Sequence, residues 1–302
     1  MKKTKLVILL AVLAVVSCKK KDEILTPTPD PTPPLATVSA VPGSFTQKVL
    51  IEECTGNWCG YCVDGAYRVE QIVNKNAGKT IAVAVHQGDA MDVIYNTLKS
   101  TFANTYGFPA GMVARIPAAG EQWMDRGSWD ASATNVLNKT ASCGLAIEGV
   151  KLSGNTATIN IHAGFNQNLT GTYNVTIYLV ENNVSGVGSS YDQHNYLSKD
   201  GSAPDPSSPY YNQPTLITGY KHMNVVRKAL TAVLGDAIPS NKLISGGEYV
   251  ITKSVDISAY KVGDLKIVAF INKVDADSKK HEVMNVQEAS FYTGQLTGKN
   301  WD

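Results

Sequence analysis

Two cysteines three positions apart carry the clearest chemistry in this sequence. Cys59 and Cys62 belong to the run Trp-Cys-Gly-Tyr-Cys at residues 58–62, which follows an apolar stretch and precedes a helical pattern. A thiol at the N-terminal end of a helix lies near free backbone N–H groups, which can lower its pKa to roughly 3.5–7.5. We therefore predict that Cys59 is the attacking thiolate and that Cys62 resolves the mixed disulfide.

Other interpretations of the cysteines stay open. Cys59 and Cys62 would also suit a permanent structural disulfide. A zinc site needs about four ligands, commonly in two close pairs. The sequence has one Cys-x-x-Cys pair and scattered histidines, so we expect no metal and no cofactor. Cys54 and Cys143 would either form a second disulfide or remain as two buried thiols.

The apolar patterns around the motif predict the elements that position it. Residues 48–54 read as a buried strand, and residues 62, 66, 69 and 73 repeat at helical spacing. Gly78 is a plausible end for that helix. The further elements expected in this half are a strand at 80–85, a helix at 91–102, a strand at 110–116 and a helix at 128–140.

This order of elements resembles the thioredoxin superfamily. The resemblance rests on Trp58 and the two cysteines at a strand–helix junction, and on Phe108-Pro109 about fifty residues later. It implies an α/β thioredoxin-like N-terminal domain at 44–142. It also implies that Pro109 is a cis-proline facing the disulfide and that Phe108 offers backbone groups to an extended substrate. An ordinary trans proline that ends a helix is the alternative.

The resemblance gives a role to one acid as well. Glu53 would match the buried carboxyl that helps to move the proton of the second cysteine. The alternative is that Glu52 or Glu53 points to solvent from the end of a strand.

The N-terminus reads as an export signal. Lys2, Lys3 and Lys5 precede an apolar run at 6–16, which is too short to span a bilayer. Val-Val-Ser-Cys at 15–18 resembles the lipobox of bacterial lipoproteins, which implies a signal peptide at 1–17 and lipidation of Cys18. An ordinary secretory signal is the alternative.

A Pro-rich segment separates Cys18 from the first predicted strand. Residues 18–43 contain a short charged run and prolines interleaved with Thr and Asp, a composition typical of an extended tether. We expect the folded part to begin near Ser44. The expected location is the outer membrane, where a lipid anchor at Cys18 holds the protein on the periplasmic face or the cell surface.

The second half has the period-two pattern of strands. These runs are expected at 144–152, 156–163, 173–179, 248–257, 265–271 and 282–291, and 225–234 reads as a strand or a short helix. Six or seven short strands in this length favour an all-β immunoglobulin-like sandwich domain at 143–302.

A long polar stretch interrupts these strands between Glu181 and Tyr220. It is rich in Gly, Ser and Asn and holds the tyrosines 191, 196, 210, 211 and 220. This composition suits a recognition loop. We favour a loop that folds back on the predicted sandwich.

Composition narrows the possible functions. The 302 residues include 27 Lys and Arg and 26 Asp and Glu, so the net charge of +1 gives no electrostatic footprint for nucleic acid. The apolar fraction of 43% excludes a wholly disordered chain.

The whole layout resembles the outer membrane protein 28-like lipoproteins. The motif at 55–62, the run at 108–115 and the run Lys-His-Met-Asn-Val-Val-Arg at 221–227 carry this resemblance. Cys54 and Val63 depart from the usual pattern, where an aromatic residue and proline are more common. The resemblance implies an envelope lipoprotein that exchanges disulfides with extracytoplasmic protein thiols. The alternative is a non-catalytic surface adhesin or binding lipoprotein that uses its β-domain.

Overall fold

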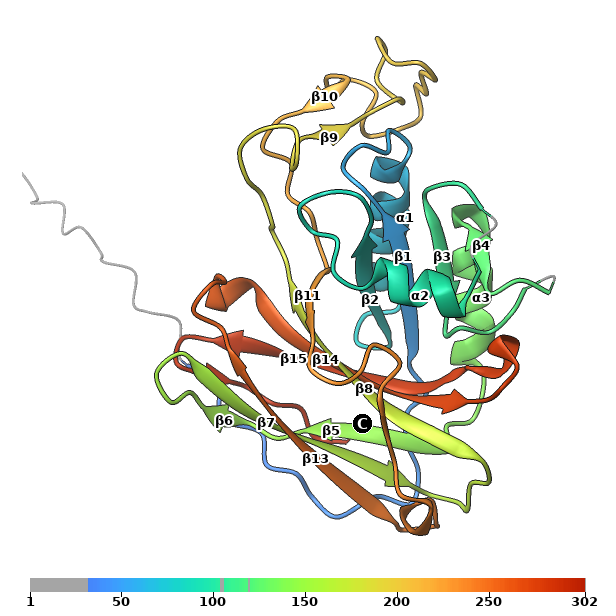
Figure 1. Ribbon diagram of the computed structural model, residues 1–302, viewed down its shortest axis with the longest axis vertical. Helices are drawn as coiled ribbons and strands as arrows, with labels where there is room; N and C mark the ends of the chain where they lie inside the picture. The colour runs from blue at the N-terminus through green and yellow to red at the C-terminus, as the bar shows by residue number, and fades with distance from the viewer. Residues whose placement is uncertain (1–31, 104–105, 119, 302) are drawn as a thin grey trace, which may run out of the picture. The chain divides into compact units, whose positions relative to one another are not determined.

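The computed structural model describes residues 32–103, 106–118 and 120–301 (Figure 1). The expected signal peptide, the lipidation site Cys18 and the first part of the tether lie outside these residues. Within the described ranges, the helices are all too short or too polar to cross a membrane. The fold is mostly β-sheet with few helices.

Seven elements form the first half of the described chain. They are β1 (Val49–Thr55), α1 (Cys62–Lys75), β2 (Thr80–His86), α2 (Tyr95–Thr101), β3 (Ala110–Val113), β4 (Trp123–Asp125) and α3 (Trp129–Leu137), with a 3-10 turn η1 (Arg126–Ser128) before α3. Strand β1 pairs with β2 in parallel and with β3 antiparallel, and β4 pairs antiparallel with β3. The sheet order is therefore β4-β3-β1-β2.

Helix α1 begins at the motif and packs one apolar side inward. Cys62, Val69 and Ile72 are buried at helical spacing. Asp64 in the first turn and Lys75 in the last turn have the charges that stabilise the two ends of a helix. The helix ends before Gly78, whose φ of +75° is a backbone conformation that glycine adopts without strain.

The second half is almost entirely strands. They are β5 (Cys143–Ile147), β6 (Val150–Lys151), β7 (Thr156–Phe165), β8 (Thr172–Glu181), β9 (Gln193–His194), β10 (Leu216–Ile217), β11 (Val225–Ala229), β12 (Asp236–Ala237), β13 (Glu248–Asp256), β14 (Leu265–Val274), β15 (Val283–Tyr292) and β16 (Gln295–Leu296). Short 3-10 turns lie at η2 (Ser240–Lys242), η3 (Val262–Asp264) and η4 (Ser278–Lys280).

One large sheet runs through both halves. Its order is β4-β3-β1-β2-β11-β8-β14-β15-β16-β6, with β12 paired to β8. The join is narrow, because β2 and β11 meet at the single parallel pair Ala84 and Val225. A second sheet, β13-β7-β5, lies below the large sheet in Figure 1. The expected division at residues 142/143 stays a prediction, since strands from both sides share the large sheet.

Strands β8 and β14 are buried on both faces. Val175, Ile177 and Leu179 of β8 belong to the apolar cluster shared with β5, β7 and β13. Tyr178 and Val180, which point to the opposite face, belong to the cluster formed mainly by the first half. Side chains of a strand alternate between faces, so these two strands hold two cores together.

Residues 33–39 contact the C-terminal end of the chain. The Ala36 N–H donates to the Thr297 carbonyl at 2.8 Å, and the Trp301 indole N–H donates to the Ser39 carbonyl at 2.8 Å. Specific contacts thus begin before Ser44, although these residues are in neither a helix nor a strand.

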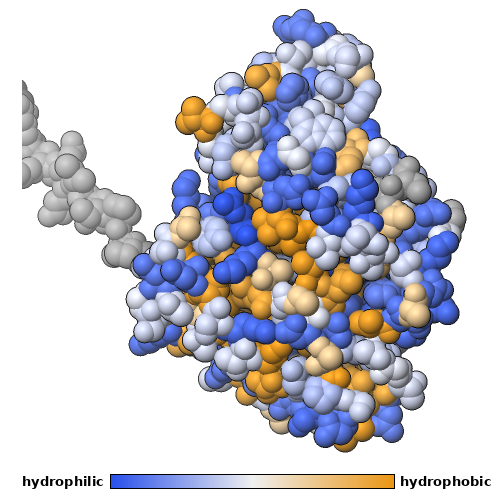
Figure 2. Space-filling view, viewed as in Figure 1, coloured by the Kyte–Doolittle hydropathy of each residue, from blue (hydrophilic) through white to orange (hydrophobic). Residues whose placement is uncertain are grey.

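The surface mixes polar and apolar side chains. On the face seen in Figure 2, apolar residues gather near the middle of the molecule and polar residues surround them. Among the described residues, Trp58, Tyr61 and Tyr196 are large apolar side chains with substantial exposure. These three flank the two cysteines, so part of the exposed apolar surface belongs to the candidate site.

Candidate functional site

Cys59 and Cys62 form a disulfide between the end of β1 and the start of α1. Two successive turns hold the motif: the Cys59 N–H donates to the Gly56 carbonyl at 3.0 Å, and the Cys62 N–H donates to the Cys59 carbonyl at 3.1 Å. Cys62 is the first helical residue, and Cys59 precedes the helix rather than lying in its first turn. Cys59 is 5% exposed and Cys62 is 2% exposed.

Two aromatic residues and a cis-proline lie close to the motif. The peptide bond between Phe108 and Pro109 is cis, as the sequence resemblance implies. The Trp58 ring packs on Phe108 at a centroid distance of 5.2 Å, and its Nε1–H donates to the Gln87 carbonyl at 2.7 Å. Trp58 remains 41% exposed, so it presents an aromatic surface next to Cys59.

Glu53 is buried behind the motif rather than pointing to solvent. Burial raises its pKa to about 8, and its Oε1 has no hydrogen-bond partner among the described residues. Glu53 and Cys62 line the same small cavity of about 20 Å³, which has the size of a single water molecule. At neutral pH this carboxyl is therefore mainly protonated.

Gly65 allows this close packing, and sequence reasoning missed it. A Cβ at residue 65 would lie 2.6 Å from Glu53 Oε1 and 2.8 Å from Pro109 Cβ. Glycine destabilises the interior of a helix. A glycine one turn after Cys62 is therefore the sequence signal that could have indicated close packing of another part of the chain against the helix.

The loop after β2 holds the backbone turn that leads into the motif. Asp89 Oδ2 accepts from the Asn57 backbone N–H at 2.9 Å and from His86 Nδ1 at 2.7 Å. Burial would raise the pKa of Asp89, but the hydrogen bond and charge of His86 and the backbone N–H groups of Asn57 and Met91 outweigh it and lower the pKa. Asp89 is thus an ionised anchor for the turn before Cys59.

Residues 189–218, here called the cover segment, lie on the motif beside the start of α1 (Figure 1). The His194 N–H donates to the Asn57 carbonyl at 2.8 Å, and the Tyr196 N–H donates to the Gly60 carbonyl at 2.9 Å. Gln193 Nε2 donates to the Cys59 carbonyl at 2.9 Å. Three successive parts of the motif therefore receive donors from this one segment.

Side chains add to this contact. The Tyr196 ring packs edge-on against Tyr61 at 5.4 Å and leaves no room for a Cβ at Gly60. The Asn57 amide donates to the carbonyls of Ser189 and Asp192. This placement corrects our expectation that the tyrosine-rich stretch folds back on the predicted sandwich. The reason is that the motif's turns leave carbonyl oxygens that backbone donors from another segment can satisfy.

His222 holds the base of the cover segment. Its Nε2 donates to the Tyr191 carbonyl at 2.8 Å, and its ring packs against His86 at 5.2 Å. Burial is the largest cause that lowers the pKa of His222, to about 4, and the neighbouring His86 adds to it. His222 is therefore neutral at physiological pH.

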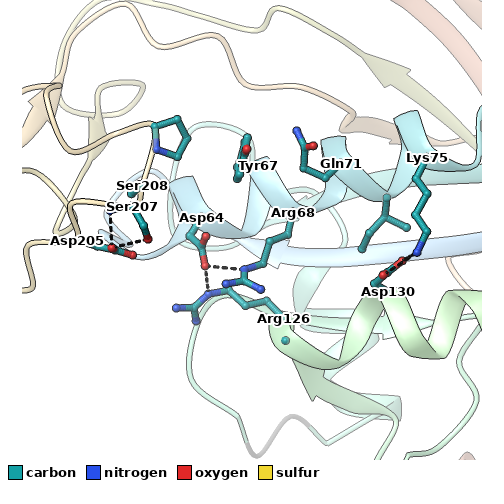
Figure 3. Close-up of a pocket in the computed structure, with 13 residues that line it drawn as sticks. Asp64, Tyr67, Arg68, Gln71, Lys75, Arg126, Asp130, Asp205, Ser207 and Ser208 are labelled. Atoms are coloured by element: carbon teal, nitrogen blue, oxygen red, sulfur yellow. Dashed lines mark hydrogen bonds and ion pairs between the residues drawn. The ribbon is translucent and has the colours of Figure 1, made fainter.

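A groove of about 380 Å³ lies along α1 beside the motif (Figure 3). Residues of α1 line one side, and Asp205, Ser207 and Ser208 of the cover segment lie near the start of the helix. Its cations are paired: Asp64 accepts from Arg68 and Arg126, and Asp130 accepts from Lys75 at 2.9 Å. The Arg126 guanidinium also lies 5.7 Å from the Tyr61 ring centroid, which connects the groove to the motif.

Cys54 and Cys143 are both free and buried, so they do not form the second disulfide that the sequence left open. Cys54 belongs to the core of the first half and Cys143 to the core between the two sheets of the second half. Burial raises the pKa of both thiols, that of Cys143 to about 12. Within the described residues, no cluster of three or more His, Cys, Asp or Glu side chains is arranged to hold a metal ion.

The fold and the site together define a β-rich protein with a Cys-x-x-Cys disulfide at the start of α1, and with a cis-proline and a buried acid packed against the first turns of that helix. The chain belongs to the outer membrane protein Omp28 family, whose model matches residues 95–295. This membership confirms the expected location at the outer membrane. The matched residues begin after Cys59 and Cys62, so the match does not include the disulfide motif.

Solved structures give a second comparison. The chain is similar to HBP35 of Porphyromonas gingivalis, with a TM-score of 0.64, 20% identity, and coverage of 83% of this chain and 77% of that one. This similarity concerns the fold alone. A protein of Agrobacterium tumefaciens matches with a TM-score of 0.47 and 10% identity, over 80% of this chain and 94% of its own.

A domain of the outer membrane lipoprotein Omp28 from Porphyromonas gingivalis matches with a TM-score of 0.29 and 14% identity, over 54% of this chain and 92% of its own. No curated protein sequence matches the chain.

Proposed function

We propose that this outer membrane protein exchanges disulfides with extracytoplasmic protein thiols through Cys59 and Cys62. The observation that carries the proposal is a disulfide at the start of α1 beside a buried acid. Glu53 and Cys62 line the same small cavity, and Glu53 Oε1 has no hydrogen-bond partner among the described residues.

The arrangement around the motif supports a thioredoxin-like unit at residues 44–142. Its supporting features are the sheet order β4-β3-β1-β2, the antiparallel pairing of β3, and the position of the motif between β1 and α1. We propose an immunoglobulin-like unit at 143–302, because two sheets there enclose one apolar layer. In this proposal the two units share the large sheet.

The reaction needs only sulfur chemistry. A client thiolate attacks Cys59 Sγ, the Cys59–Cys62 bond breaks, and Cys62 leaves as a thiolate. A second client thiolate then attacks the client sulfur of the mixed disulfide and releases Cys59 as a thiolate. The client loses two electrons to form its disulfide, and the motif gains them as two thiols. The same steps in reverse reduce a client disulfide.

Glu53 has the protonation state that the leaving group requires. Its pKa of about 8 keeps the carboxyl protonated at neutral pH, and it shares a cavity with Cys62. The carboxyl would give its proton to the Cys62 thiolate as that sulfur leaves, and it would take the proton back in the reverse direction.

Titration with glutathione, followed by thiol trapping, tests the proposal on the full mature protein. We expect a reversible Cys59–Cys62 couple between about −270 and −120 mV. Cys62→Ser is expected to accumulate a mixed disulfide on Cys59, and Cys59→Ser to abolish exchange. The double variant Cys54→Ala, Cys143→Ala is the control and should keep the couple.

A motif that stays oxidised well below about −300 mV would contradict the proposal. The disulfide would then be structural, and a binding lipoprotein or adhesin with the motif as scaffold would be the remaining interpretation. The burial of both cysteines, together with the hydrogen bonds that the cover segment makes to the motif, is the observation that favours this second candidate.

A further inference from the structure

The cover segment lies against the turn that carries the disulfide. It supplies hydrogen-bond donors to the carbonyls of Asn57, Cys59 and Gly60, and the Tyr196 ring lies over Gly60 between the two cysteines. A protein client must bring its sulfur close to Cys59 Sγ in line with the disulfide bond. The chain around that sulfur would meet the cover segment.

Most of the cover segment is attached by polar contacts, and Tyr191, near its Gly188 end, packs against the small apolar cluster of Met91, Val184 and Val225. From residue 192 to residue 218, no side chain belongs to the hydrophobic clusters formed by the described residues. The hydrogen bonds between the segment and the motif each contribute little net stability, because water can replace them once the segment has moved away. The segment can therefore leave the motif while both cores stay intact.

The cover segment is held together by its own contacts, and a glycine flanks it at each end. Strands β9 and β10 pair within it, and Asn195 Nδ2 donates to the Tyr210 carbonyl at 2.9 Å. Gly188 and Gly219 flank it with φ of +92° and +66°, and a Cβ at either would meet no atom within 4 Å. These positions have the freedom that a hinge needs.

The stems outside the two glycines are fixed. Asn183 donates to Asp264 at 2.8 Å, and Lys266 donates to Asn224 at 2.9 Å, so both ends are tied to β14 or the residue before it. We infer that residues 189–218 form a gate, hinged at Gly188 and Gly219, that admits small thiols to the disulfide and protein thiols only when it opens. This inference rests on the proposed thiol–disulfide exchange and names its regulation.

The first test compares two reductants on the oxidised mature protein. A small dithiol, dithiothreitol, and a protein dithiol, reduced thioredoxin, each reduce wild type, the double variant Gln193→Ala, Tyr196→Ala, and the control Tyr211→Ala. Tyr211 lies in the same segment, but its carbonyl pairs with the Lys199 N–H rather than with the motif. The cysteine pair is followed by thiol trapping.

We expect the double variant to raise the rate with the protein dithiol by about tenfold and the rate with dithiothreitol by less than about threefold. The control should match wild type with both reductants. Equal acceleration with both reductants, or no acceleration with either, would overturn the gate.

Amide hydrogen exchange tests the gate without thiol chemistry. The amides of His194 and Tyr196 are expected to exchange at least about a hundredfold faster than those of β8, and faster still in the double variant. Equal protection of these amides and β8 would overturn the gate whatever the disulfide does. Rapid exchange together with a disulfide that neither reductant reduces would reject thiol exchange and leave the opening of the segment supported.

Discussion

At the scale of single residues, Glu53 links the candidate chemistry to stability. Its folded-state pKa of about 8 exceeds the usual value of 4.5, and burial is the cause. The folded protein therefore keeps a proton that the unfolded chain releases. The stabilising contribution is fully present below about pH 4.5, falls as the pH rises, and is lost above about pH 8.

Glu53→Gln should remove this dependence, because a neutral amide does not titrate. We expect the variant to be more stable than wild type at pH 8.5 by on the order of 4–5 kcal/mol and to exchange disulfides more slowly. Urea unfolding at pH 5 and pH 8.5 measures the stability. Glu70→Gln, on the exposed side of α1, is the control. An unchanged pH slope in Glu53→Gln would contradict the assignment.

His222 predicts a pH dependence of the opposite sign. Its folded-state pKa of about 4 lies below the usual 6.5, so the unfolded chain binds the proton more tightly. His86, Asp89, Tyr191 and Tyr220 face it, and burial dominates. Stability should therefore fall as the pH drops from about 6.5 to about 4, by on the order of 2–3 kcal/mol.

Replacing His222 with Asn should remove most of this loss of stability at acid pH. The Asn side chain has an N–H donor to offer the Tyr191 carbonyl but does not titrate in this range. Unfolding curves at pH 4.5 and pH 7 measure the change, with His194→Asn, an exposed histidine of the cover segment, as the control. If His222→Asn loses stability between these two pH values as steeply as wild type, another group is responsible.

At the scale of elements, the contact of α1 with β1 and Pro109 depends on Gly65. Alanine normally stabilises a helix by up to about 1 kcal/mol relative to glycine. Here the added Cβ would lie 2.6 Å from Glu53 Oε1 and 2.8 Å from Pro109 Cβ. Either the helix or the strand must move, so packing overrides helix propensity.

We expect Gly65→Ala to destabilise the protein by about 1–3 kcal/mol in guanidinium unfolding. Gln71→Ala, on the exposed side of the same helix, should change stability by less than about 0.5 kcal/mol. A stabilised Gly65→Ala variant would mean that the helix has room at this position.

At the scale of the whole molecule, one buried ion pair connects the two halves. The Arg115 guanidinium donates to both carboxylate oxygens of Glu52 at 2.7 Å, and both side chains are almost completely buried. It also lies between the rings of Phe102 and Phe270, at 5.2 and 5.1 Å from their centroids. Phe270 belongs to β14, so the pair ties the motif's strand to the second half.

Removing one partner leaves a buried charge without compensation. We expect Arg115→Ala to cost about 3–5 kcal/mol in the free energy of unfolding. The double variant Glu52→Leu, Arg115→Met should recover most of that loss, because an apolar pair of similar size needs no counter-charge. Additive losses in the double variant would contradict this account.

The sequence alone determined the elements and the chemistry that lie close together along the chain. Helical spacing after Cys62, alternation in residues 173–179 and the turn before Trp58 are local signals, because burial of one side of an element fixes its periodicity. Local sequence signals also predicted the Cys-x-x-Cys motif, the importance of Pro109 and the location at the outer membrane. Glu53 was a candidate only because of the resemblance.

Only the tertiary structure decided what meets across long separations in sequence. The cover segment on the motif, His222 against His86, and Arg115 against Phe270 each join residues that no local pattern relates. Cys54 and Cys143 stayed apart for the same reason, since they belong to different cores. Such contacts arise when whole elements pack to bury their apolar faces, and that packing depends on all elements at once.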